Sequence, residues 1–276
     1  MILVFDVGNT EITIGLFNAE LLRGHWRIMT AVARTADEFG VLIGGLLERE
    51  GFDPKRINGV AIGSVVPTVT APLAEACSRY LPASAAIIID ANSGLPITLD
   101  VDEPLTVGAD RIINTLAASR LYGRDCIVVD LGTATTFDCI TGEGVFIGGA
   151  IAPGVETSAQ TLTRRTSKLP ATDLSVPQRA IGTRTEDCIR AGVIFGAADA
   201  IDGMVRRIKR EWPHKETPLV VATGGLAEMF GAICKEFDKV EPFLTLQGLQ
   251  MAHTLLTETA AEGLNEPRRT GKKKTK

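Results

Sequence analysis

The chain has 276 residues, of which 45% are hydrophobic, and at roughly 100–200 residues per domain this length predicts two domains with sizeable cores. No apolar run approaches the ~20 residues that a membrane-spanning helix needs, and the first residues lack the basic flank of a signal peptide. We therefore expect a cytoplasmic protein that does not enter a membrane. The five cysteines lack C-x-x-C spacing and there are only three histidines, so neither a disulfide framework nor a zinc site is expected.

The net charge of −4 is unevenly distributed along the chain. Six of the 29 basic residues lie in the last ten positions, so the preceding body carries 23 basic against 33 acidic residues. A net-acidic body argues against a nucleic-acid-binding face. We expect residues 263–276 to form a disordered basic tail.

A strand that ends in a polar turn occurs twice. Apolar residues 2–5 lead into a turn at residues 6–13, and residues 127–129 lead into a second turn at residues 130–136. Each turn begins with an aspartate and continues with a glycine and hydroxyl residues. Glycine lets backbone N–H groups approach an anion, and aspartate can hold hydrated Mg²⁺ beside a phosphate. One such turn alone is more often an ordinary hairpin turn, but its duplication predicts two turns that face each other and clamp a phosphate.

The elements around the first turn predict a mixed α/β domain. A helix should begin at Thr35, because Thr35 and Glu38 have the spacing of a capping box, and should run to Glu50. We expect further strands at 12–17, 25–28, 58–66 and 85–90, and a helix that begins at Pro67. Three strands followed by helix, strand, helix and strand differ from a regular Rossmann alternation.

The second copy repeats this order of elements. Strands are expected at 126–130, 135–140, 145–151 and 219–222, and helices after 154 and at 185–211, 226–237 and 249–262. The expected fold class is therefore α/β, with two duplicated domains of mixed five-stranded sheets flanked by helices. We place the N-terminal domain at residues 1–112 and the C-terminal domain at residues 113–262.

Asp110 and Arg111 lie at the start of an apolar helix that crosses between the two copies. A helix N-terminus and a neighbouring guanidinium both favour an ionised carboxylate. Such an aspartate can accept the proton of a substrate hydroxyl while the arginine binds an acidic group. From these residues alone, Asp110 could equally be a helix-terminal charge with Arg111 as its solvated neighbour.

The ordered set of motifs resembles the type III pantothenate kinase family. The motifs are Asp6-Val-Gly-Asn-Thr10, Gly108-Ala-Asp-Arg111, Asp130-Leu-Gly-Thr-Ala-Thr-Thr136, Gly148-Gly149 with Pro153-Gly154, and Thr223-Gly-Gly225 with Pro242-Phe-Leu-Thr-Leu-Gln-Gly248. The resemblance implies a duplicated ribonuclease-H-like (actin-like ATPase) fold and a homodimer with its active site at the interface. It also implies transfer of the ATP γ-phosphoryl group to pantothenate in coenzyme A biosynthesis, with Mg²⁺ and a monovalent cation, K⁺ or NH₄⁺.

The same resemblance implies a role for individual residues. Asp110 would be the proton acceptor, Asp130 the monovalent-cation ligand, and Asp6 a ligand of Mg²⁺ through water. The ATP-phosphate residues would be Asp6, Val7, Gly8, Asn9, Thr10, Glu11, Ile12, Thr13 and Thr133. The pantothenate-binding residues would be Gly108, Ala109, Asp110, Arg111, Thr185 and Val101.

Val101 departs from the tyrosine that many family members have at this position. Valine can pack against the dimethyl part of pantothenate but cannot donate the phenolic hydrogen bond. We expect a difference in substrate binding of about 0.5–1.5 kcal/mol.

Two other readings of the motifs remain open. A phosphatase or polyphosphate hydrolase of the same superfamily would use the clamp with water as acceptor, and the Gly108–Arg111 motif argues against it. A non-catalytic regulatory relative would have no chemical need for Asp6, Asp110, Arg111 and Asp130 together.

Overall fold

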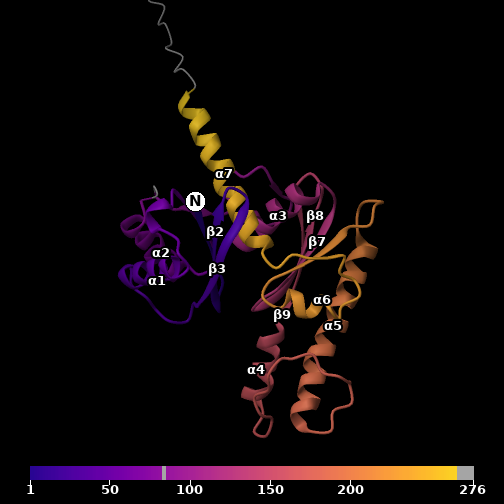
Figure 1. Cartoon of the computed structure of the whole chain (residues 1–276). Helices are drawn as coiled ribbons and strands as arrows, with labels where there is room; N and C mark the ends of the chain where they lie inside the picture. The colour runs from indigo at the N-terminus through magenta and orange to yellow at the C-terminus, as the bar shows by residue number, and fades with distance from the viewer. Residues whose placement is uncertain (83–84, 266–276) are drawn as a thin grey trace, which may run out of the picture.

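The computed structural model describes residues 1–82 and 85–265, which form two β-sheets with helices around and between them (Figure 1). The first sheet has the strand order β3-β2-β1-β4-β5. Its strands are β1 (Ile2–Val7), β2 (Glu11–Asn18), β3 (Leu21–Met29), β4 (Gly59–Ser64) and β5 (Ile87–Ile89). β1 pairs antiparallel with β2 and parallel with β4, so the sheet is mixed as predicted.

The second sheet repeats this topology and has the order β11-β10-β7-β8-β9-β6. Its strands are β7 (Cys126–Leu131), β8 (Ala134–Ile140), β9 (Val145–Pro153), β10 (Leu219–Thr223), β11 (Lys239–Val240) and β6 (Thr98–Leu99). β7 pairs antiparallel with β8 and parallel with β10, as β1 does with β2 and β4. Asp6 and Asp130 therefore occupy equivalent ends of the two central strands.

The helices cover both sheets and fill the space between them. They are α1 (Ala36–Arg49), α2 (Pro67–Tyr80), α3 (Ala109–Tyr122), α4 (Val155–Arg165), α5 (Thr185–Glu211), α6 (Ala227–Gly231) and α7 (Leu244–Asn265), with short 3-10 turns η1 (Pro54–Arg56) and η2 (Pro104–Thr106). α1 and α2 pack on one face of the first sheet. α3 and α7 pack together on its other face, and α3 also packs on the second sheet.

Two sequence patterns explain why the central elements form where they do. The side chains of Leu3, Val4 and Phe5 are fully buried because β1 is covered on both faces, as its continuous apolar run predicts. The predicted capping box is present at Thr35, whose side chain accepts from the Glu38 backbone while the Glu38 carboxylate accepts from the Thr35 backbone.

Helices α4 and α5 extend away from the two sheets as an arm (Figure 1). The middle of α5, including Ile194, Ala198 and Ile201, is buried against the second sheet. Its first turns instead lie beside α4 at the end of the arm. Among the described residues, no helix is both long and apolar enough to cross a bilayer.

The structure differs from the predicted elements in several places. α6 ends at Gly231 instead of residue 237, because the backbone N–H groups of Lys235 and Glu236 donate to the Asp202 carboxylate of α5. β6 adds a two-residue edge strand to the second sheet. α7 continues to Asn265, and the remaining part of the expected basic tail, residues 266–276, lies outside the described residues.

Candidate functional site

The two repeated turns meet each other between the sheets. The Thr10 and Thr133 hydroxyl oxygens are 2.8 Å apart, although the residues are separated by 123 positions. Within the first turn the Gly8 N–H donates to the Glu11 carbonyl at 3.0 Å, and within the second the Gly132 N–H donates to Ala134 at 3.0 Å. The predicted facing arrangement of the two turns is therefore present.

Glycines at two other motifs allow the chain to pack tightly around the second turn. A side chain at Gly154 would collide with the carbonyl oxygens of Gly132 and Thr133. Gly224 has φ +91°, and a side chain there would collide with Asp130 Oδ1. Both positions require glycine because the backbone comes too close for a Cβ atom.

Four aspartates from four different elements approach one another where the two sheets meet. Asp6 lies on β1, Asp110 on α3, Asp130 on β7 and Asp138 on β8. Burial, followed by the charges of Asp130 and Asp110, raises the pKa of Asp6 to about 8. Burial and the neighbouring carboxylates likewise raise the pKa of Asp130 to about 7. These shifts mark a site where negative charges repel one another in a poorly solvated environment.

A cluster of carboxylates such as this one can bind cations. Carboxylate oxygens are the ligands that hard cations prefer, and a cation would relieve the mutual repulsion of Asp6 and Asp130. Within residues 1–82 and 85–265, no three His, Cys, Asp or Glu side chains are close enough to share one metal ion directly. Carboxylates such as those of Asp6 and Asp130 can hold a cation whose other ligands are water or phosphate oxygens.

Arg111 is held by a buried ion pair and an aromatic ring. Its Nε donates to Asp138 Oδ1 at 2.6 Å, and the Asp138 side chain is fully buried. The guanidinium carbon lies 4.8 Å from the centroid of the Phe146 ring, and Gly149 leaves room for the Nη2 atom. Within the part of the chain that the structure describes, Arg111 Nη2 and Asp138 Oδ2 are buried without hydrogen-bond partners. The guanidinium is thus fixed through Nε, and the Arg111 side chain, which is 16% exposed, can still bind an anionic group through its accessible part.

Asp110 lies in the first turn of α3, next to Arg111. Its Oδ1 accepts from the Arg111 backbone N–H at 2.9 Å, and a side chain at Gly108 would collide with this oxygen. Asp110 and Arg111 lie in the first turn of α3, as predicted, and Gly108 directly precedes the helix. The upward effect of Asp110 on the pKa values of Asp6, Asp130 and Asp138 places its carboxylate within the same cluster.

The other two predicted substrate residues lie in different environments. Val101 packs against the apolar cluster that contains Phe146, the ring on which Arg111 stacks. Thr185 is exposed at the first position of α5, at the end of the arm and away from the carboxylates (Figure 1). Within one chain, the structure therefore brings Val101 to the Arg111 site and leaves Thr185 outside it.

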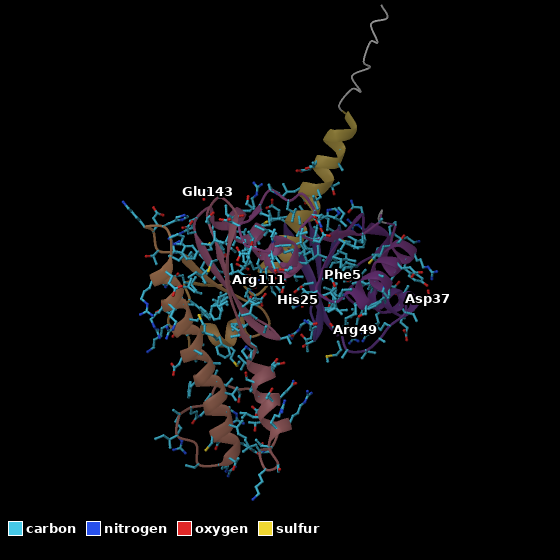
Figure 2. All side chains as sticks on the ribbon, turned by 180° about the vertical axis from the view of Figure 1, so that it is seen from behind. Phe5, His25, Asp37, Arg49, Arg111 and Glu143 are labelled. Atoms are coloured by element: carbon cyan, nitrogen blue, oxygen red, sulfur yellow. The ribbon has the colours of Figure 1, made fainter. Side chains whose placement is uncertain are left out.

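Four residues at this junction were not predicted from the sequence. Asp138 and Asn114 contact Arg111 and Asp130, respectively, and Thr245 donates to Asn114 at 2.9 Å. Arg27 of β3 pairs with Glu11 at 3.6 Å and lies beside Gly225. Figure 2 shows Arg111 and His25 near the region where the two sheets meet. Thr245 belongs to one of the sequence motifs, but its hydrogen bond to Asn114 was not predicted because the two residues are separated by 131 positions.

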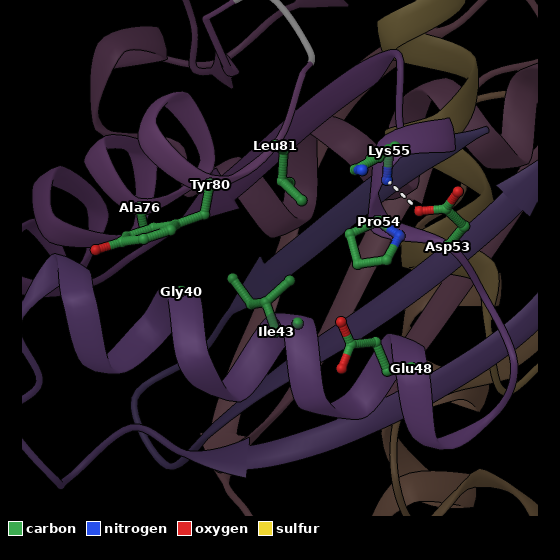
Figure 3. Close-up of a pocket in the computed structure, with 10 residues that line it drawn as sticks. Gly40, Ile43, Glu48, Asp53, Pro54, Lys55, Ala76, Tyr80 and Leu81 are labelled. Atoms are coloured by element: carbon green, nitrogen blue, oxygen red, sulfur yellow. Dashed lines mark hydrogen bonds between the residues drawn. The ribbon is translucent and has the colours of Figure 1, made fainter.

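Two cavities lie away from the carboxylates. The first, about 290 Å³, is enclosed by α1, α2 and η1 beside Tyr80 (Figure 3). The second, about 250 Å³, lies between α4, the following loop and the first turns of α5. Asp6, Asp110 and Asp130 line neither of them. The candidate site is consequently defined by the converging polar groups rather than by these cavities.

The raised pKa of Asp6 predicts how stability changes with pH. The folded state retains a proton that an unfolded carboxyl, with a pKa of 3.8, has already lost. The ligand-free protein should therefore lose stability as the pH rises towards 8, by up to about 1.4 kcal/mol per pH unit. Urea unfolding at pH 7 and 8 measures this loss.

An Asp6→Asn variant is the control for that measurement, since asparagine cannot titrate. The free energy of unfolding of this variant should fall less between pH 7 and 8 than that of the unmodified chain. The comparison separates Asp6 from His253 and the Met1 amino group, whose pKa values are lowered by burial and whose effects have the opposite sign. Equal pH dependence in the two proteins would contradict the assignment.

Comparisons with known proteins show which family the chain resembles. The sequence profile of the family described as type III pantothenate kinase matches residues 2–207. The chain is 44% identical over 254 residues to a type III pantothenate kinase of Thermomicrobium roseum, covering 92% of this chain and 96% of the relative. It is also 44% identical to one of Roseiflexus castenholzii, covering 92% of this chain and 99% of that protein.

Solved structures support the same fold at low sequence identity. A Campylobacter jejuni chain assigned to the Baf family of transcriptional activators aligns with TM-score 0.56 and 17% identity, covering 94% of this chain and 99% of the other. A Sinorhizobium meliloti chain assigned as a 2-dehydro-3-deoxygalactonokinase aligns with TM-score 0.55 and 11% identity, covering 94% and 96%. These likenesses concern the duplicated α/β fold alone. The profile match and the identity to curated relatives show that the chain belongs to the type III pantothenate kinase family.

Proposed function

We propose that the protein transfers the γ-phosphoryl group of ATP to the primary hydroxyl of pantothenate, giving 4'-phosphopantothenate, the first step of coenzyme A biosynthesis. The observation that carries the proposal is the position of Asp110. Its carboxylate accepts from the backbone N–H of Arg111 and lies within the carboxylate cluster of Asp6 and Asp130 at the two phosphate turns. A proton acceptor, an anion-binding group and a phosphate clamp are the components that a small-molecule kinase needs.

The two facing turns would hold the phosphates of ATP. Residues 6–13 supply the Thr10 hydroxyl, and Thr133 supplies the opposing hydroxyl. Asp6 would hold Mg²⁺ through water, and Asp130 would bind a monovalent cation, K⁺ or NH₄⁺. When bound, these cations supply positive charge that offsets the charge of the transferring phosphoryl group.

Pantothenate would bind on the other side of Asp110. The accessible part of the Arg111 guanidinium binds its carboxylate, while Val101 packs against its dimethyl group. Asp110 accepts the proton of the primary hydroxyl as the hydroxyl oxygen attacks the γ-phosphorus and ADP leaves from the opposite side. Most of the acceleration comes from the positions of these groups, because phosphoryl transfer requires little covalent chemistry from the protein.

Thr185 would complete this site in a homodimer. Its position at the end of the α4–α5 arm, away from Asp110 in its own chain, is suited to contacting the site of a second copy. The proposal places the active site at the subunit interface.

An ADP-release assay with full-length protein, ATP, Mg²⁺ and K⁺ tests the proposed reaction. ADP release should require pantothenate, and release at the same rate without it would instead favour a phosphatase or polyphosphate hydrolase. Binding of ATP without turnover under any of these conditions would favour a regulatory protein. Repeating the assay with Na⁺ or NH₄⁺ in place of K⁺ tests the monovalent cation separately.

A further inference from the structure

A chain of hydrogen bonds links the start of α7 to Asp130. The Thr245 hydroxyl donates to Asn114 Oδ1 at 2.9 Å, and Asn114 Nδ2 donates to Asp130 Oδ2 at 3.3 Å. Asn114 is 1% exposed and Thr245 is 7% exposed. These three residues come from α3, α7 and β7, so the chain joins elements that are distant in sequence.

The chemistry of the groups sets the direction of this chain. A carboxylate that holds a cation is ionised and can only accept hydrogen bonds, so the Asn114 amide then presents its NH₂ group to Asp130, as it does in this structure. Its carbonyl oxygen then points the other way, towards Thr245, whose hydroxyl can donate to it. Thr245 therefore holds the Asn114 amide in the one orientation in which its NH₂ group donates to Asp130. Thr245→Val would remove this hydrogen bond while keeping nearly the same side-chain volume.

The two oxygens of Asp130 consequently have different surroundings. Oδ2 is occupied by Asn114. Oδ1 lies against Gly224, where a Cβ atom would collide with it, and 3.8 Å from the position of a Cβ at Gly132. Both glycines belong to turns beside the phosphate clamp. The oxygen without a side-chain partner thus faces the backbone-lined space between these turns.

A second observation indicates a ligand at this position. Thr223 is paired in register with Asp130 in the parallel ladder of β10 and β7, so the two side chains project from the same face of the sheet. The Thr223 hydroxyl is fully buried, and it has no hydrogen-bond partner within residues 1–82 and 85–265. Buried hydroxyl groups normally have a partner, and a cation beside Asp130 would accept the hydroxyl oxygen as a ligand.

We propose that Thr245 and Asn114 are positioning residues, which hold Asp130 Oδ2 and so direct Oδ1, together with the Thr223 hydroxyl, at a monovalent cation. This inference rests on the proposed kinase function and adds to it how the cation site is built. Asp130 alone would be free to rotate its carboxylate away from the glycine turns. The hydrogen-bond chain prevents this rotation and makes the site depend on the docking of α7.

Cation-dependent melting tests the inference without using activity. The full-length protein is melted with Mg²⁺ and a non-hydrolysable ATP analogue while KCl replaces choline chloride at constant ionic strength. The rise in Tm should saturate with K⁺, and Thr245→Val should increase the half-saturating K⁺ concentration by about fivefold, as expected for one hydrogen bond. Thr245→Ser, which keeps the hydroxyl, should restore the original value.

Matched variants separate positioning from a general structural role. Thr257→Val changes another hydroxyl of α7, one that donates only to a carbonyl of its own helix, and should leave the K⁺ dependence unchanged. Thr223→Val should abolish the K⁺-dependent rise in Tm. In the kinase assay, Thr245→Val should raise the half-saturating K⁺ concentration while kcat at saturating K⁺ and KM for pantothenate stay within about twofold.

Two results would overturn the inference. One is a Thr245→Val protein with lower Tm and kcat but an unchanged half-saturating K⁺ concentration, which would make Thr245 merely structural. The other is an unmodified protein that shows no K⁺-specific rise in Tm. Neither result would refute the kinase function, because pantothenate-dependent ADP release is measured separately and would persist.

Discussion

Asp110→Asn should lower kcat by at least about 10²-fold, the usual contribution of a general base, while ATP still binds. Asparagine has the same shape as aspartate and can still accept from the Arg111 backbone N–H, so the helix start should be preserved. It cannot accept the proton of the pantothenate hydroxyl. Steady-state kinetics and calorimetric titration with ATP measure the two parts of this prediction.

Asp37→Asn is the matched control for this variant. Asp37 also lies in the first turn of a helix, α1, but it is exposed and pairs with Arg79 and Tyr80. Its substitution should leave kcat unchanged. If Asp110 were only a helix-terminal charge, its removal would cost about 0.3–1 kcal/mol of stability and no activity; an Asp110→Asn enzyme with normal kcat would establish that simpler role.

Asp138→Ala should reduce the free energy of unfolding by about 3–5 kcal/mol. Asp138 is the buried partner of Arg111 Nε, and its loss would leave that guanidinium largely buried without a counter-charge. Asp138→Asn keeps an oxygen that can accept from Nε, so it should cost less. Urea unfolding of the three proteins measures the order of stability. KM for pantothenate should rise more in Asp138→Ala, where Arg111 is no longer fixed, than in Asp138→Asn, where Nε keeps an acceptor.

Asp173→Ala provides the comparison with an exposed ion pair. Asp173 pairs with Arg190, but its side chain is 67% exposed, and exposed pairs contribute about 0–1 kcal/mol. Comparing the two alanine variants therefore tests whether the burial of an ion pair, and not only its charge, determines how much stability is lost. An Asp138→Ala protein as stable as Asp173→Ala would show that the Arg111–Asp138 pair is not needed for the fold.

Local patterns in the sequence predicted the parts of the fold that depend on local interactions. The duplicated strand and turn predicted both central strands, and the glycine and hydroxyl residues predicted that the turns would face each other. Thr35 and Glu38 predicted the start of α1, because a capping box involves only neighbouring residues. The position of Asp110 and Arg111 in the first turn of α3 was also predicted, from the apolar residues that follow them.

Contacts between distant segments account for what the sequence did not predict. Asp138 alternates with apolar neighbours in β8, a pattern typical of a strand with one solvent-facing side. In the structure α3 covers that side and supplies Arg111. α6 ends early because Asp202, on another helix, binds the backbone of Lys235 and Glu236. The link from Thr245 through Asn114 to Asp130 likewise exists only after α7 packs against α3.

Transfer of the phosphoryl group to pantothenate can be measured directly with ATP labelled by 18O in the non-bridging γ-phosphate oxygens. After incubation with the enzyme, Mg²⁺, K⁺ and pantothenate, the products are separated and their masses are measured by mass spectrometry. We predict 4'-phosphopantothenate that carries the whole label, since the attacking hydroxyl supplies only the bridging oxygen. Label found only in inorganic phosphate, with pantothenate unchanged, would contradict the proposed function.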